Sequence, residues 1–101
     1  MKGSQTFRVY YGSTKNLRWI VYDDSKQVVE GTSVSAEILD TSDKSVLNVL
    51  EVVREDVGIY SAVVDTTALG LDIGKYLIEF SCLAGGQNKV KRDFLSVRYT
   101  L

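Results

Sequence analysis

One short pattern occurs twice in this sequence and constrains the fold more than any other feature. Both copies read aspartate, any residue, glycine, any residue, tyrosine: Asp56-Val57-Gly58-Ile59-Tyr60 and Asp72-Ile73-Gly74-Lys75-Tyr76. Glycine adopts backbone angles that other residues avoid, so each copy predicts a sharp turn. The tyrosine then points inward, where its hydroxyl can bond to nearby backbone. Such corners are typical of antiparallel β-sandwiches, and the residues given this structural role are Asp56, Gly58, Tyr60, Asp72, Gly74 and Tyr76.

Apolar residues alternate with polar ones on both sides of these corners, which predicts strands. The expected strands cover residues 6–11, 17–22, 34–39, 46–54, 60–64 and 76–82, with a last strand after the Gly85-Gly86-Gln87-Asn88 hairpin turn. Trp19 is the only tryptophan, and we expect it at the centre of the core. A chain of 101 residues is the right size for one domain. The sequence therefore predicts a single all-β domain over residues 1–101, a seven-stranded antiparallel β-sandwich.

Three segments depart from the simple pattern of alternating strands and turns. In residues 46–54 the apolar side chains fall at helical spacing, whereas the valine content favours a strand; we interpret the segment as a strand and keep a helical turn as the alternative. Residues 66–73 are expected to form a crossing loop. Phe94 is out of register with the apolar residues that follow it, which suggests a bulge near Asp93.

Composition removes several classes of chemistry. The chain has no histidine, which excludes Ser-His-Asp and Cys-His nucleophilic sites and histidine-ligated metals. Cys82 is the only cysteine and is interpreted as core filler. A net charge of −1 argues against nucleic-acid binding, which usually requires a clear excess of basic residues. Paired carboxylates such as Asp23-Asp24 and Glu55-Asp56 keep open a calcium-dependent adhesive domain. The prediction is a non-enzymatic protein without a catalytic residue, cofactor or metal.

The chain ends and the single cysteine bear on location. Residues 1–6 are polar and lack the apolar core of a signal peptide, and no apolar run is long enough to cross a membrane. One cysteine allows no internal disulfide. We expect a protein of the cytoplasm, or of a particle assembled there, with no membrane partner.

Taken in order, several segments resemble a known family. They are Leu17-Arg18-Trp19-Ile20-Val21-Tyr22-Asp23, the two glycine–tyrosine corners, and Phe94-Leu95-Ser96-Val97 followed by Tyr99. This order resembles immunoglobulin-like β-sandwiches of the bacterial Ig-like and macroglobulin type, and the small Ig-like domains of tailed-phage virion proteins. Antibody-type domains place cysteine two residues after the corner tyrosine, but Ala62 and Ile78 occupy those positions here. The resemblance implies an Ig-like fold without the inter-sheet disulfide.

The resemblance implies a structural role in a virion, as a head decoration, a head–tail connector or a tail or baseplate accessory, assembled in the bacterial host cytoplasm. Its partners would be capsid or tail proteins, including other copies of this chain. The alternative is a carbohydrate- or cell-surface-binding adhesion module. The expected partner contacts are outward-facing aromatic and apolar residues and a C-terminal basic cluster: Tyr10, Ile20, Tyr22, Lys89, Lys91 and Arg92. The basic cluster can also be interpreted as a solvated strand edge.

Overall fold

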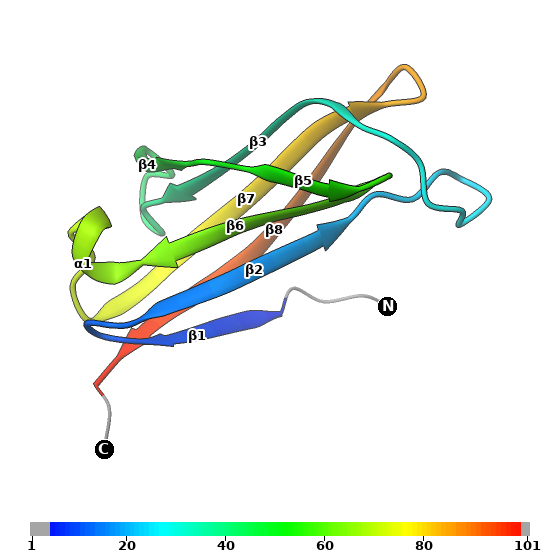
Figure 1. Cartoon of the computed structure of the whole chain (residues 1–101). Helices are drawn as coiled ribbons and strands as arrows, with labels where there is room; N and C mark the ends of the chain where they lie inside the picture. Colours follow the sequence, from blue (N-terminus) through cyan, green and yellow to red (C-terminus); the bar gives the residue numbers. More distant parts are fainter. Residues whose placement is uncertain (1–4, 100–101) are drawn as a thin grey trace.

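The structure is a computed structural model, and it describes residues 5–99. Within this range the chain is almost entirely β-structure, with eight strands and one short helix (Figure 1). Their order is β1 (Thr6–Tyr10), β2 (Thr14–Ile20), β3 (Thr32–Leu39), β4 (Val46–Leu50), β5 (Val53–Asp56), β6 (Ile59–Asp65), α1 (Thr66–Leu69), β7 (Gly74–Ala84) and β8 (Gln87–Arg98).

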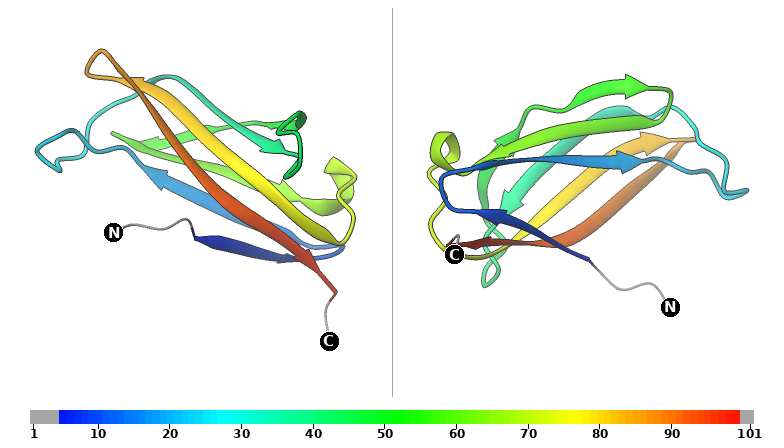
Figure 2. Two further views of the ribbon diagram at one scale, coloured as in Figure 1. Left: turned by 180° about the vertical axis from the view of Figure 1, so that it is seen from behind. Right: turned by 60° about the horizontal axis from the view of Figure 1, so that its bottom comes forward.

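Two sheets pack face to face, as Figures 1 and 2 show. In the described part of the chain, one sheet has the order β1-β8-β7-β3-β4 and the other has the order β2-β6-β5. β7 and β8 form the longest ladder, an antiparallel hairpin closed by Gly85 and Gly86. β1 departs from the expected antiparallel arrangement. It runs parallel to the last part of β8, because the chain turns at Gly12 and continues as β2 in the other sheet.

The predicted count of seven strands is wrong, because the segment 46–54 is not one strand. Val46–Leu50 pairs with β3 in the larger sheet, whereas Val53–Asp56 pairs with β6 in the smaller sheet. The chain crosses between the sheets at Glu51 and Val52. No helical turn is present in this segment. Of the apolar residues at helical spacing, only Leu50 is buried, whereas Val46, Val49 and Val53 are exposed.

The space between the sheets holds the core, and Trp19 lies in it as predicted. Its ring stacks on Phe80 from the opposite sheet, with ring centroids 4.8 Å apart and an interplanar angle of 13°. Leu17, Ile38 and Leu95 are among the fully buried side chains around this pair. Burial of these apolar side chains from both sheets is the main stabilising contribution to the fold.

Two smaller expectations need correction. The predicted loop 66–73 begins with α1, whose first turn is capped by Asp65: the carboxylate accepts the amides of Thr67 and Ala68, each at 3.1 Å. No bulge occurs near Asp93, since the β7–β8 register runs unbroken there. Phe94 instead lies half-buried beneath the Lys75 ammonium, 4.3 Å from its ring centroid.

Among residues 5–99, no helix has the length and apolar character needed to span a membrane.

Candidate functional site

The first glycine–tyrosine corner is the tight turn between β5 and β6. Gly58 has a φ of 67°, a value that favours glycine. Its carbonyl accepts the amide of Val21 at 2.8 Å, which ties the turn to the chain that leaves β2. A Cβ on Gly58 would lie 2.5 Å from the Val29 carbonyl oxygen and 2.5 Å from a Val28 methyl carbon. Both the backbone angle and the missing side chain are therefore required here.

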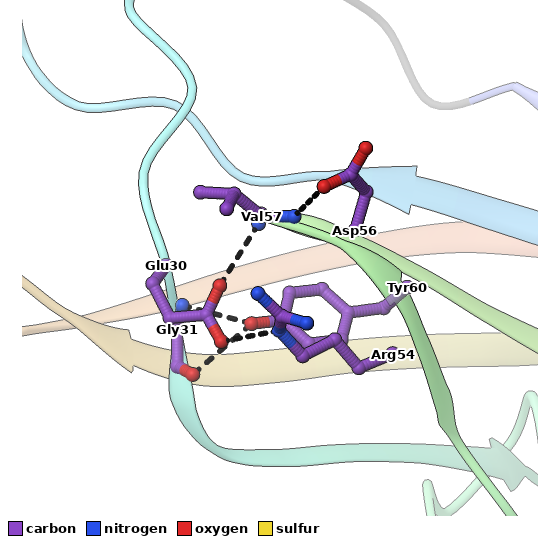
Figure 3. A network of polar contacts seen from close by, with 7 residues as sticks. Glu30, Gly31, Arg54, Asp56, Val57 and Tyr60 are labelled. Atoms are coloured by element: carbon purple, nitrogen blue, oxygen red, sulfur yellow. Dashed lines mark hydrogen bonds and ion pairs between the residues drawn. The ribbon is translucent and has the colours of Figure 1, made fainter.

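Charged side chains surround the same corner, as Figure 3 shows. Glu30 accepts the amide of Gly58 at 3.2 Å and the Nε–H of Arg54 at 2.6 Å. The Arg54 bond stabilises the carboxylate and holds the pKa of Glu30 below its ordinary value. Asp56 accepts the amide of Val57 at 2.7 Å. This hydrogen bond lies within the turn, so the predicted structural role of Asp56 is a local one.

The Tyr60 hydroxyl does not bond to its own turn. It accepts the amide of Gly31 at 2.9 Å and donates to the Gly31 carbonyl at 3.0 Å, so one hydroxyl satisfies both backbone groups of a buried glycine (Figure 3). Tyr60 is itself buried, 6.1 Å from the Phe80 ring. This tyrosine therefore fixes the segment between β2 and β3 against the core.

The second corner lies at the opposite end of the sandwich (Figure 1), where the chain enters β7. Tyr76 donates its hydroxyl to the carbonyl of Asp72 at 2.9 Å, closing its own turn. Tyr76 is only half-buried, and the glycine between them, Gly74, is exposed. The two copies of the pattern thus make different contacts: the first joins distant segments, and the second is local.

Other carboxylates, including the calcium candidate Asp23, accept hydrogen bonds within turns. Asp23 accepts the amides of Ser25 and Gln27 at 2.8 and 2.9 Å, and Asp40 accepts the amide of Ser42 at 2.8 Å. The Ser42 bonds hold the pKa of Asp40 below its ordinary value. No group of three or more potential metal ligands occurs among the residues that the structure describes.

Four of the six predicted partner contacts lie together on one open side of the sandwich. β1 pairs only with Phe94–Arg98, so the outer edge of β8 before that point has no neighbouring strand within the described range (Figure 2). Facing it is the free edge of β2. Between them run two adjoining hollows of about 100 Å³ and 240 Å³. We call this surface the β2–β8 groove; its lining includes Ile20, Tyr22, Phe80, Lys89, Val90 and Lys91.

The groove combines an apolar floor with a cationic rim. Phe80 belongs to the core, whereas Ile20 and Tyr22 are 42% and 47% exposed. Lys89 and Lys91 lie on the other wall. An apolar, partly aromatic surface bordered by positive charge is suited to a protein segment that carries apolar and acidic side chains.

Beneath this rim lies a buried carboxylate that the sequence reasoning missed. Asp93 is fully buried; its Oδ1 accepts the amide of Gln5 at 3.1 Å and lies 3.4 Å from Lys91 Nζ. Its Oδ2 has no hydrogen-bond partner among the described residues. The signal was available: Asp93 lies two and four residues before the apolar residues Leu95 and Val97, and that alternation places it on the core face.

The other two predicted contacts lie elsewhere. Arg92 is on the outer face of the larger sheet, where its Nε–H donates to Glu79 at 2.9 Å. Tyr10 lines a different hollow, of about 790 Å³, together with Lys75 and Tyr99. Tyr99 in turn meets Tyr11 edge-on, with ring centroids 6.2 Å apart. Tyrosines therefore gather at the end of the sandwich where β1 and β8 finish.

Cys82 is buried in the core, and its burial raises the pKa of the thiol. It is therefore protonated near neutral pH.

Comparison with known proteins adds information on the fold. No protein-family model matches the chain, and no curated protein sequence matches it. Among solved structures, the chain is similar to part of the endo-beta-1,4-mannanase from Thermotoga petrophila, with a TM-score of 0.64 and 18% sequence identity. The alignment covers 97% of this chain but 18% of the mannanase. At this identity the likeness concerns the β-fold, which this chain shares with one part of a much longer protein.

Proposed function

We propose that this chain is a non-enzymatic, immunoglobulin-like structural module that docks on a larger assembly through the β2–β8 groove. The strand order supports the immunoglobulin-like assignment. With β2 to β8 taken as strands B, C, C′, D, E, F and G, the sheets become G-F-C-C′ and B-E-D. This order resembles that of variable-type domains, except that the described residues form no C″ strand. The missing inter-sheet disulfide is replaced at the core by the Trp19–Phe80 stack.

One observation carries the docking proposal: residues from two strands that are distant in sequence meet along one open side. Ile20 and Tyr22 come from β2 and the residues just after it, and Lys89 and Lys91 come from β8. An exposed apolar floor with a charged rim is the common anatomy of a protein interface. The resemblance to phage Ig-like domains makes a capsid or tail protein the specific partner, and many copies on one particle would add avidity.

The variant Ile20→Lys tests the docking surface. It places a charge on the apolar floor, and we expect its retention on the assembled particle to fall about tenfold or more. Val63→Lys is the matched control, because Val63 is an exposed valine (54%) in the central strand of the smaller sheet and lies outside the groove. Equal co-sedimentation of both variants and the unchanged protein with purified particles would refute the groove as the docking surface.

The tyrosine end favours a second candidate, the carbohydrate-binding module. Tyr10, Tyr11 and Tyr99 are at least half exposed. Tyr10 and Tyr99 border the hollow of about 790 Å³, and the Tyr11 ring lies edge-on to that of Tyr99. Flat rings with hydroxyl groups offer sugars both an apolar face and hydrogen bonds. If this is the function, the protein binds oligosaccharides on a glycan array and Tyr99→Ala removes the binding. Failure to bind any glycan would exclude this candidate and leave the groove proposal intact.

A further inference from the structure

We propose that the hollow of about 790 Å³ at the tyrosine end is a site for an acidic saccharide, a sugar chain that carries carboxylate or phosphate groups. This inference rests on the second candidate function, the carbohydrate-binding module, and names the class of its ligand. It is independent of docking through the β2–β8 groove, because the two linings share no residue.

The strand registers bring positive side chains together on the outer face of the larger sheet. Arg8 of β1 pairs with Ser96 of β8, and Ser96 pairs in turn with Lys75 of β7. Paired residues share a face and neighbouring strands lie about 4.8 Å apart, so the two cations flank the serine. Arg98, two residues after Ser96, lies on the same face and pairs with Tyr10. Three strands therefore contribute one cation each to this end of the sheet.

No acidic side chain in the described part of the chain neutralises these cations. Arg8, Lys75 and Arg98 are exposed, and none of them forms an ion pair with another residue of 5–99. The described lining of the hollow contains no acidic residue, and the Phe94 ring lies beneath the Lys75 ammonium. Further along β7 on this face, Glu79 is already in an ion pair. A ligand in the hollow therefore meets uncompensated positive charge, which favours an anion.

The tyrosines make a sugar the favoured anion. Tyr10 and Tyr99 border the hollow and are 53% and 70% exposed, so their rings are available to the apolar face of a sugar. Their hydroxyls and that of Ser96 can both donate and accept hydrogen bonds, as sugar hydroxyls do. A nucleic-acid strand fits less well, because it is bound along an extended basic track, whereas this patch is confined to one end of a chain with a net charge of −1.

An array of acidic and neutral glycans tests the inference on the unchanged protein. We expect binding to members that carry uronate, sialate or phosphate groups, and binding at least about tenfold weaker to their neutral counterparts. The carboxylated and phosphorylated members distinguish the two sources of negative charge. Affinity for the bound members should fall severalfold as sodium chloride rises from about 50 mM to about 500 mM, because salt screens exposed charges.

A double variant assigns the binding to this site. Lys75→Gln/Arg98→Gln removes two cations from the hollow, and we expect its affinity for acidic glycans to fall about tenfold or more. Lys26→Gln/Lys44→Gln is the matched control, because it removes the same charge from two exposed lysines outside the hollow and should bind as the unchanged protein does. Thermal melts check that both variants are folded.

The outcomes separate this inference from the candidate function on which it rests. Equal binding of acidic and neutral glycans, or equal losses in the two double variants, would overturn the inference and leave the carbohydrate-binding candidate standing. Tighter binding of a single-stranded oligothymidine than of any acidic glycan would also overturn it. Absence of binding to every glycan would exclude the candidate function and this inference with it. None of these results bears on docking through the β2–β8 groove.

Discussion

Replacing Gly58 with alanine is expected to lower the free energy of unfolding by roughly 2–4 kcal/mol. Two effects add at this position. Alanine disfavours the φ of 67°, and its Cβ would meet the Val29 carbonyl oxygen at 2.5 Å, so backbone must move. Chemical denaturation of the variant and the unchanged protein measures the difference.

Gly70→Ala is the matched control for this prediction. Gly70 has the same φ of 67°, but no atom lies within 4 Å of a Cβ built there. Its substitution should cost only the conformational part, about 1 kcal/mol. Equal losses at Gly58 and Gly70 would show that the close approach to Val29 has no energetic weight, and that the first corner is looser than the structure describes.

Removing the Tyr60 hydroxyl is the second large effect. In Tyr60→Phe the buried amide and carbonyl of Gly31 both lose their partner, and we expect a loss of about 1–3 kcal/mol of unfolding free energy. Tyr76→Phe provides the comparison, because that hydroxyl makes one exposed bond to Asp72, which water can replace. Its loss should stay below about 1 kcal/mol.

Equilibrium unfolding of the two phenylalanine variants distinguishes the corners. If Tyr76→Phe is the more damaging change, the assignment of the long-range role to Tyr60 is wrong. If both are neutral, neither hydroxyl contributes to stability, and the repeated pattern reflects turn formation by glycine alone.

The local signals in the sequence were sufficient for most strands and for the turn at Gly58. Glycine and tyrosine at the spacing of the repeated pattern predict a turn with an inward ring, and Tyr60 shows both features. What the pattern does not contain is the partner of each hydroxyl. Gly31 is 29 residues away from Tyr60, and their contact depends on how the segment after β2 folds back over the core.

The crossing between β4 and β5 could not be predicted from periodicity. Leu50, Glu51 and Val52 contain no glycine, proline or asparagine that would mark a turn, so the segment reads as one strand. Only the pairing of β4 with β3 and of β5 with β6 separates them. A change of sheet without a turn residue is a tertiary event, set by which neighbouring edge is available.

For the candidate groove, in contrast, the sequence alone identified several of the residues that line it. Strand phase alone placed Ile20 and Tyr22 on an exposed face, and the basic cluster identified Lys89 and Lys91. Their meeting across two sheets required the topology. Arg92 satisfied the same sequence criterion as Lys91 but faces the other side of the sheet, because neighbouring residues in a strand face opposite sides. Tyr10 lies in β1, at the end of the sandwich away from the groove.

Photo-crosslinking from position 22 in the native cell tests the central proposal most directly. A photoreactive residue in place of Tyr22 should join the chain to a structural protein present in many copies on one particle, and the same residue in place of Val63 should not. Crosslinks from position 63 but none from position 22 would contradict docking through the β2–β8 groove.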